Sequence, residues 1–271
     1  SWLPARPLCR TESEVTTMLL ALDIGNTHIV MGCMEGRTIR YLCRMATNRV
    51  TTGAEYAVTM SRLLEFAHIA PDAIDGSIIS SVVPQVTRSL SAAVKMLTGV
   101  VPLVADNTIR SDLTVQIDDP TTLGSDLLVA AVGALDIYQP PLIIIDMGTA
   151  TTVTAVDADG AFRGGAIIPG VQLSLSALAS NTSLLPSISL DAPPKAIGTN
   201  TVDCMKSGSI LGTALLLDGM IDRMEAELGQ KATVVATGGL ARCIVPICQH
   251  EILLNEDLLL YGLAVLYEKN K

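Results

Sequence analysis

The chain has 271 residues, of which 49% are hydrophobic and 17% are charged, a balance that excludes an intrinsically disordered protein. Its length permits one large domain or two domains of ordinary size, each with its own core. With 27 acidic and 18 basic residues the net charge is -9, which repels phosphate backbones and excludes a nucleic-acid partner.

The first 17 residues mix Arg, Pro and Glu and contain no apolar central region, so they do not form a secretory signal. We expect residues 1–17 to be a disordered extension, or residues added by cloning, with Met18 as the natural start. No apolar run approaches the roughly 20 residues that span a bilayer. These features predict a soluble, cytoplasmic protein without a membrane partner.

The cysteines lack the dense spacing of a secreted disulfide framework. Cys243, Cys248 and His250 come nearest to a metal-binding group, but they have no second pair of ligands to complete a tetrahedron. We therefore interpret all six cysteines as reduced thiols: Cys9, Cys33, Cys43, Cys204, Cys243 and Cys248.

The first organised segment is an apolar run, 18–22, that stops at the sequence Asp-Ile-Gly-Asn-Thr of residues 23–27. A dinucleotide-binding fold would continue into a helix at this point. Here the pattern predicts two further strands, 28–33 and 38–42, joined by a turn at Glu35-Gly36. The segment is therefore predicted to be a buried strand, a glycine turn and a hairpin.

The second half of the chain repeats this plan. A buried strand, 142–145, ends at Asp146-Met147-Gly148, and two strands, 152–156 and 161–168, follow. Two such units about 120 residues apart indicate a duplicated fold. We predict two lobes, 18–139 and 140–271, with helices at 53–67, 86–97, 123–135 and 256–268.

The residues of each turn suit phosphate binding. Glycine lets backbone amides approach phosphate oxygens, and Asn and Thr add neutral donors. The acid at each strand end would be repelled by phosphate, so it is expected to hold a cation or the water around it. A third strand, 232–236, leads into Thr237-Gly238-Gly239 and a helix, a pattern that fits either a tight turn or an adenosine-binding loop.

Together these segments resemble the type III pantothenate kinases, a branch of the acetate and sugar kinase, Hsp70 and actin superfamily. The resemblance covers residues 18–271 and includes two further family signatures, at 164–170 and 198–201. It implies a duplicated actin-like (ribonuclease H-like) α/β fold, with two lobes whose central mixed sheets are flanked by helices. It also implies ATP-dependent phosphorylation of pantothenate, the first step of coenzyme A synthesis.

The resemblance further implies Mg²⁺, a monovalent cation (K⁺ or NH₄⁺), and a homodimer whose pantothenate pocket crosses the subunit interface. Leu173, Leu175 and Leu178 are the aliphatic residues expected at that surface. Within the family pattern, Asp126 matches the catalytic acid that accepts the hydroxyl proton. Asp146 matches the monovalent-cation position, and Asp23 would hold Mg²⁺ through water.

The other matched positions fall into two groups. Positions matching ATP contacts are Asp23, Ile24, Gly25, Asn26, Thr27, His28, Ile29, Val30, Thr149, Thr237, Gly238 and Gly239. Positions matching pantothenate contacts are Ile117, Gly124, Ser125, Asp126, Leu127 and Thr201.

Two of these positions depart from the family pattern. Leu127 stands where the family usually has Arg, and Ile117 where it tends to have Tyr. Both changes fall on the pantothenate side, and neither affects the nucleotide turns. Three readings follow: an active pantothenate kinase, a non-catalytic regulatory paralogue related to transcription accessory factors, or a kinase for another small hydroxylated substrate.

Overall fold

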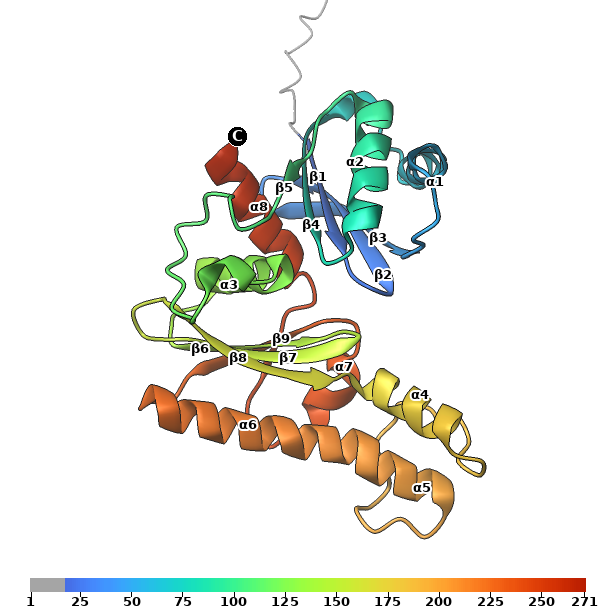
Figure 1. The fold of residues 1–271 in the computed structure, drawn as a ribbon, viewed down its shortest axis with the longest axis vertical. Helices are drawn as coiled ribbons and strands as arrows, with labels where there is room; N and C mark the ends of the chain where they lie inside the picture. Colours follow the sequence, from blue (N-terminus) through green and yellow to red (C-terminus); the bar gives the residue numbers. More distant parts are fainter. Residues whose placement is uncertain (1–17) are drawn as a thin grey trace, which may run out of the picture.

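The computed structural model describes residues 18–271, so the expectation for residues 1–17 lies outside the described residues. The fold consists of two five-stranded sheets, ordered β3-β2-β1-β4-β5 and β8-β7-β6-β9-β10 (Figure 1). In each sheet the first three strands are antiparallel, and the last two are parallel to the first. The two sheets thus share one topology, which confirms the predicted duplicated actin-like architecture.

In the first sheet, the strand before the glycine turn is buried on both faces, as the unbroken apolar run predicted. The turn continues into β2 and not into a helix, and Gly36 (φ 56°) closes the following hairpin. A capping box formed by Thr52 and Glu55 starts the first helix. The elements are β1 (Met18–Ile24), β2 (His28–Glu35), β3 (Thr38–Ala46), α1 (Gly53–Phe66), β4 (Ile74–Ser81), α2 (Pro84–Thr98) and β5 (Leu103–Val104).

The second sheet is covered on its outer face by a long helix that continues from a short one through a π-helical segment, Ser207–Leu211 (Figure 1). Leu175, expected at the surface, is buried in the core beneath this sheet, so that part of the expectation was wrong. The elements are β6 (Leu142–Met147), β7 (Ala150–Val156), β8 (Phe162–Pro169), α4 (Val171–Asn181), α5 (Thr201–Lys206), α6 (Gly212–Leu228), β9 (Thr233–Thr237), α7 (Ala241–Ile244) and β10 (Leu253–Leu254).

Two helices lie between the sheets, α3 (Ser125–Ile137) and α8 (Leu258–Asn270) (Figure 1). One apolar cluster joins them to both sheets, because it includes residues of β1 and β4 as well as β6 and β9. The C-terminal helix, predicted at 256–268, therefore packs on the first sheet as well as on α3. This shared core fixes the relative position of the two lobes.

The two helices cross at a pair of glycines. A Cβ atom at Gly133 would lie 2.6 Å from the carbonyl oxygen of Leu258, and one at Gly262 would overlap the carbonyl oxygen of Val129. Both distances are below van der Waals contact, so only glycine permits this approach of the two backbones.

We expect Gly262→Ala to lower the free energy of unfolding by about 1–3 kcal/mol, because the added methyl group has no space at the crossing. Gly219→Ala is the matched control: Gly219 is exposed on α6, and no described atom lies within 4 Å of its added Cβ. That substitution is expected to stabilise by roughly 0.5–1 kcal/mol. Chemical denaturation measures both, and equal effects would contradict the packing described here.

None of the helices in residues 18–271 has the length and apolar character needed to cross a membrane.

Candidate active site

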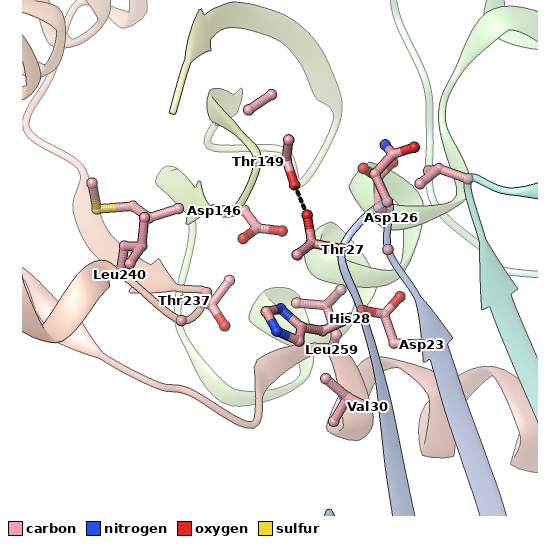
Figure 2. Close-up of a pocket in the computed structure, with 18 of the residues that line it drawn as sticks. Asp23, Thr27, His28, Val30, Asp126, Asp146, Thr149, Thr237, Leu240 and Leu259 are labelled. Carbon is pink, nitrogen blue, oxygen red and sulfur yellow. Dashed lines mark hydrogen bonds between the residues drawn. The ribbon is translucent and has the colours of Figure 1, made fainter. Parts of the chain in front are cut away.

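A cleft with a volume of about 560 Å³ lies between the two lobes. It is lined by the ends of β1, β6 and β9, the start of β2, and residues of α3, α4 and α8. The strand ends come together because the two sheets face each other through α3 and α8. Figure 2 shows that Asp23, Thr27, Asp146, Thr149 and Thr237 surround this space from both lobes.

The first glycine turn is held by its own backbone and by the residue that follows β3. The Gly25 amide donates to the His28 carbonyl (3.0 Å), and the Thr47 hydroxyl donates to the Gly25 carbonyl (2.7 Å). The predicted residues at 23–28 and Val30 line the cleft. Ile29 does not, because strand alternation turns its side chain into the core behind β2.

The second turn is also closed by the amide of its glycine, but it is one residue shorter: the Gly148 amide donates to the Ala150 carbonyl (3.0 Å). The hydroxyl groups of Thr27 and Thr149 lie 2.9 Å apart, which joins the two turns across the cleft (Figure 2). A Cβ at Gly170, at the end of β8, would lie 2.5 Å from the carbonyl oxygens of residues 148 and 149. Glycine at 170 therefore allows β8 to support the second turn.

Four carboxylates of the described residues line the cleft. Glu256 is paired with Arg242, whereas Asp23, Asp126 and Asp146 form no salt bridge. Burial, together with the charges of Asp146 and Asp126, raises the pKa of Asp23 to about 7. Burial and the charge of Asp126 raise the pKa of Asp146 to about 6, and burial also raises the pKa of Asp126. Each ionised carboxylate destabilises the others, so the cleft has an excess of negative charge.

This donor set fits a hard cation. Carboxylate oxygens are the ligands that Mg²⁺ prefers, usually with retained waters, and a cation would relieve the repulsion that raises the three pKa values. Asp23 and Asp146 come from the first strand of each sheet, so they occupy equivalent positions on the two sides of the cleft.

We expect cation binding to depend on pH. Because the pKa values of Asp23 and Asp146 are raised in the folded protein, the cation-free protein is most stable when both carboxyl groups are protonated. This contribution to stability is lost as the pH rises from about 4 through 6–7. Added Mg²⁺ should therefore raise the melting temperature more at pH 8 than at pH 5.5. Differential scanning calorimetry tests this, and an Mg²⁺ effect independent of pH would contradict it.

The third motif packs against the second turn. Gly238 has φ 90°, and its Cβ would lie 2.6 Å from both Asp146 Oδ1 and the Met147 amide nitrogen. Thr237 is fully buried at the end of β9. The motif enters α7, a helix of only four residues. Its Gly-Gly step thus forms one wall of the cleft, as expected for a loop that a ligand approaches closely.

Asp126 lies in the first turn of α3, where its Oδ1 accepts a hydrogen bond from the Leu127 amide (2.9 Å). The neighbouring Ser125 hydroxyl donates to the Ser81 carbonyl (3.0 Å), which ties the start of α3 to the end of β4. This contact fixes the position of Asp126 relative to Asp23 on the adjacent strand.

The remaining residues matched to pantothenate contacts do not line this cleft. Ile117 and Leu127 are partly buried and pack against the core cluster between the sheets. Gly124 and Ser125 lie beside Asp126 at the start of α3, whereas Thr201 is exposed at the start of α5. Within a single chain, therefore, the structure brings together the nucleotide and cation residues with Asp126, and not this second set.

Several residues that line the cleft belong to none of the three sequence motifs. Gln172, Leu173 and Ser176 form one face of the first turns of α4, directly after Gly170. Their i, i+1, i+4 spacing after a glycine turn is a signal that could have identified them. Arg44 on β3, and Glu256, Leu259 and Leu260 around the start of α8, line the cleft through tertiary packing that local patterns do not encode.

The two duplicated sheets and the cleft between them define an actin-like architecture. Similar solved structures include a putative Baf family transcriptional activator from Campylobacter jejuni (TM-score 0.58, 18% identity, 92% of this chain and 97% of that one). They also include component A of (R)-2-hydroxyglutaryl-CoA dehydratase from Acidaminococcus fermentans (TM-score 0.56, 16% identity, 93% of this chain and 96% of that one). A third is MreB5 of Spiroplasma citri bound to AMPPNP (TM-score 0.52, 10% identity, 91% of this chain and 95% of that one).

Sequence comparison defines the family within this architecture. The type III pantothenate kinase family model matches residues 19–223. Proteins named type III pantothenate kinase from Rubrobacter xylanophilus and Thermomicrobium roseum are 43% and 38% identical to this chain. Each alignment covers 93% of this chain and 98% or 97% of the relative. The chain belongs to the type III pantothenate kinase family.

Proposed function

We propose that the protein transfers the γ-phosphoryl group of ATP to pantothenate, which yields 4'-phosphopantothenate and begins coenzyme A synthesis. The observation that supports this most strongly is the meeting of both glycine turns in one cleft, at the 2.9 Å contact between Thr27 and Thr149, with Asp126 facing the same space. Full-length similarity to proteins named type III pantothenate kinase supports the choice of acceptor.

The nucleotide would lie along the three motifs. Backbone amides and hydroxyls of the turns around Gly25 and Gly148 would bind the phosphate oxygens, and the loop at Gly238 would border the adenosine. Phosphoryl transfer depends mainly on positioning and charge neutralisation. Mg²⁺, when bound, would supply positive charge to the transferring phosphoryl group, with Asp23 holding it through water. Asp146 would hold the monovalent cation, K⁺ or NH₄⁺.

Asp126 is the proposed catalytic residue. Its carboxylate would orient the primary hydroxyl of the acceptor and take its proton. The raised pKa of Asp126, caused by burial, makes the carboxylate a better proton acceptor than a solvated Asp. The contact of Ser125 with the end of β4 would hold it in place.

A coupled ADP-release assay with Mg²⁺ and K⁺ tests the proposal, with pantothenate compared with a panel of hydroxylated acids and sugars. Pantothenate should be the preferred acceptor. Faster turnover of another acceptor would show that pantothenate is not the preferred substrate. ATP binding without turnover of any acceptor would indicate a regulatory protein.

We also propose a homodimer in which a second subunit completes the acceptor pocket. Thr201, matched to a pantothenate contact, lies on α5, apart from the matched residues around Asp126 at the start of α3, and apolar side chains are exposed around α4–α6. They include Ile167, Leu173, Leu178, Val202, Leu215 and Leu216. Light scattering at micromolar concentration should give twice the monomer mass of 28.5 kDa; a strictly monomeric protein would contradict the proposal.

The free thiols at the five described cysteines support a cytoplasmic location.

A further inference from the structure

Arg44 is the only Lys or Arg that lines the cleft in the part of the chain that the structure describes. It lies on β3 directly opposite Val30 of β2, so both side chains project from the same face of the sheet. Val30 borders the cleft beside the first glycine turn (Figure 2). The sequence analysis assigned no role to Arg44.

The guanidinium group of Arg44 reaches across the cleft to the other lobe. A Cβ atom built at Gly239 would lie 3.5 Å from Arg44 Nη1, which is ordinary van der Waals contact. Gly239 belongs to the third motif, whereas Arg44 belongs to the first sheet. Arg44 therefore spans the space between the first turn and the Gly238-Gly239 loop, where any ligand contacting both motifs must pass.

The guanidinium group of Arg44 is not neutralised by a neighbouring acid, so it can bind an anionic ligand. No carboxylate among residues 18–271 forms a salt bridge with it. Glu256, an acid that also lines the cleft, is paired with Arg242. Arg40, also on β3 but outside the cleft, is paired with Glu35. Arg49 donates instead to Asn26 Oδ1 (3.2 Å), so Arg44 differs from both neighbours in having neither a salt bridge nor a side-chain hydrogen bond within residues 18–271.

We infer that Arg44 binds the polyphosphate chain of the nucleotide and links the two lobes through it. A guanidinium group presents donors in a planar fork that matches phosphate oxygens. The cleft otherwise presents Asp23, Asp126, Asp146 and Glu256 to an anionic ligand, so a fixed cation opposite the third motif offsets part of that repulsion. This inference rests on the proposed nucleotide site and adds a residue to it.

The test measures the binding of MgATP and adenosine by calorimetry, and does not depend on turnover. We expect Arg44→Gln to weaken MgATP binding by roughly tenfold, the scale of one lost hydrogen bond to a charged group, and to leave adenosine binding unchanged. Arg44→Lys should retain part of the affinity, because it keeps the charge without the fork. Arg40→Gln is the matched control, with unchanged binding of both ligands.

An MgATP affinity within twofold of the wild type in Arg44→Gln would overturn the inference and leave Arg44 a solvated surface residue. Equal weakening of MgATP and adenosine would also overturn it, since the side chain would then shape the cleft instead of binding phosphate. If MgATP binding depends on Arg44 but the protein does not phosphorylate pantothenate, the proposed function is wrong and this inference stands. If the protein phosphorylates pantothenate and MgATP binding does not depend on Arg44, this inference is wrong and the proposed function stands.

Discussion

Asp126→Asn is expected to lower turnover by roughly 10²-fold or more, the scale of a lost general base, while MgATP binding persists. Asparagine has nearly the same shape as aspartate, so the first turn of α3 and its contact with β4 should remain. What is lost is the ability to accept the hydroxyl proton. Steady-state kinetics and calorimetric titration with MgATP measure the two effects separately.

Asp136→Asn is the matched control for this prediction. Asp136 lies on the same helix, at the end away from the cleft, and pairs with Arg37 at the surface. An exposed pair of this kind contributes little to stability, so turnover should stay near the wild-type value. If Asp126→Asn also left turnover unchanged, Asp126 would have no part in the mechanism.

Gly238→Ala is expected to weaken MgATP binding strongly and to lower the free energy of unfolding by about 2–6 kcal/mol. A non-glycine residue at φ 90° is strained by about 1–3 kcal/mol. The added Cβ must also displace Asp146 and the Met147 amide, from which it would lie 2.6 Å, and such overpacking costs about 1–3 kcal/mol. Because both neighbours line the cleft, the displacement should disturb the cation and nucleotide positions.

Gly99→Ala separates these two contributions. Gly99 has φ 75° at the end of α2, and no described atom lies within 4 Å of its added Cβ. The substitution should therefore show the backbone strain alone, with MgATP affinity unchanged. Thermal unfolding and calorimetric titration of both variants decide the matter. Equal losses of stability at the two sites, with nucleotide binding intact in both, would exclude the close packing of Gly238 on the second turn.

The duplicated fold could be predicted from the sequence because its signals are local. Each phosphate turn follows an apolar strand and precedes a hairpin with clear turn residues, such as Glu35-Gly36, and these patterns determine the topology of each sheet. The nucleotide residues follow from the same motifs. Ile29 is the exception within the first motif, and strand alternation alone would have excluded its side chain from the cleft.

Other features depend on packing between distant segments. The position of α8 against α3 depends on the close approach of Gly133 and Gly262, which no periodic pattern reveals. Leu173, Leu175 and Leu178 were all expected at the surface of a subunit interface, yet only Leu173 and Leu178 are exposed. Arg44 enters the cleft because two lobes face each other, so its sequence neighbours give no signal.

The most direct test of the proposed activity is the identification of its product. The purified protein is incubated with ATP, pantothenate, Mg²⁺ and K⁺, and the acceptor is analysed by mass spectrometry, with the Asp126→Asn variant run in parallel. The proposal predicts that 4'-phosphopantothenate accumulates in step with ADP for the wild-type protein and is reduced roughly 10²-fold for the variant. ATP binding without any phosphorylated pantothenate, or an equal yield from both proteins, would contradict it.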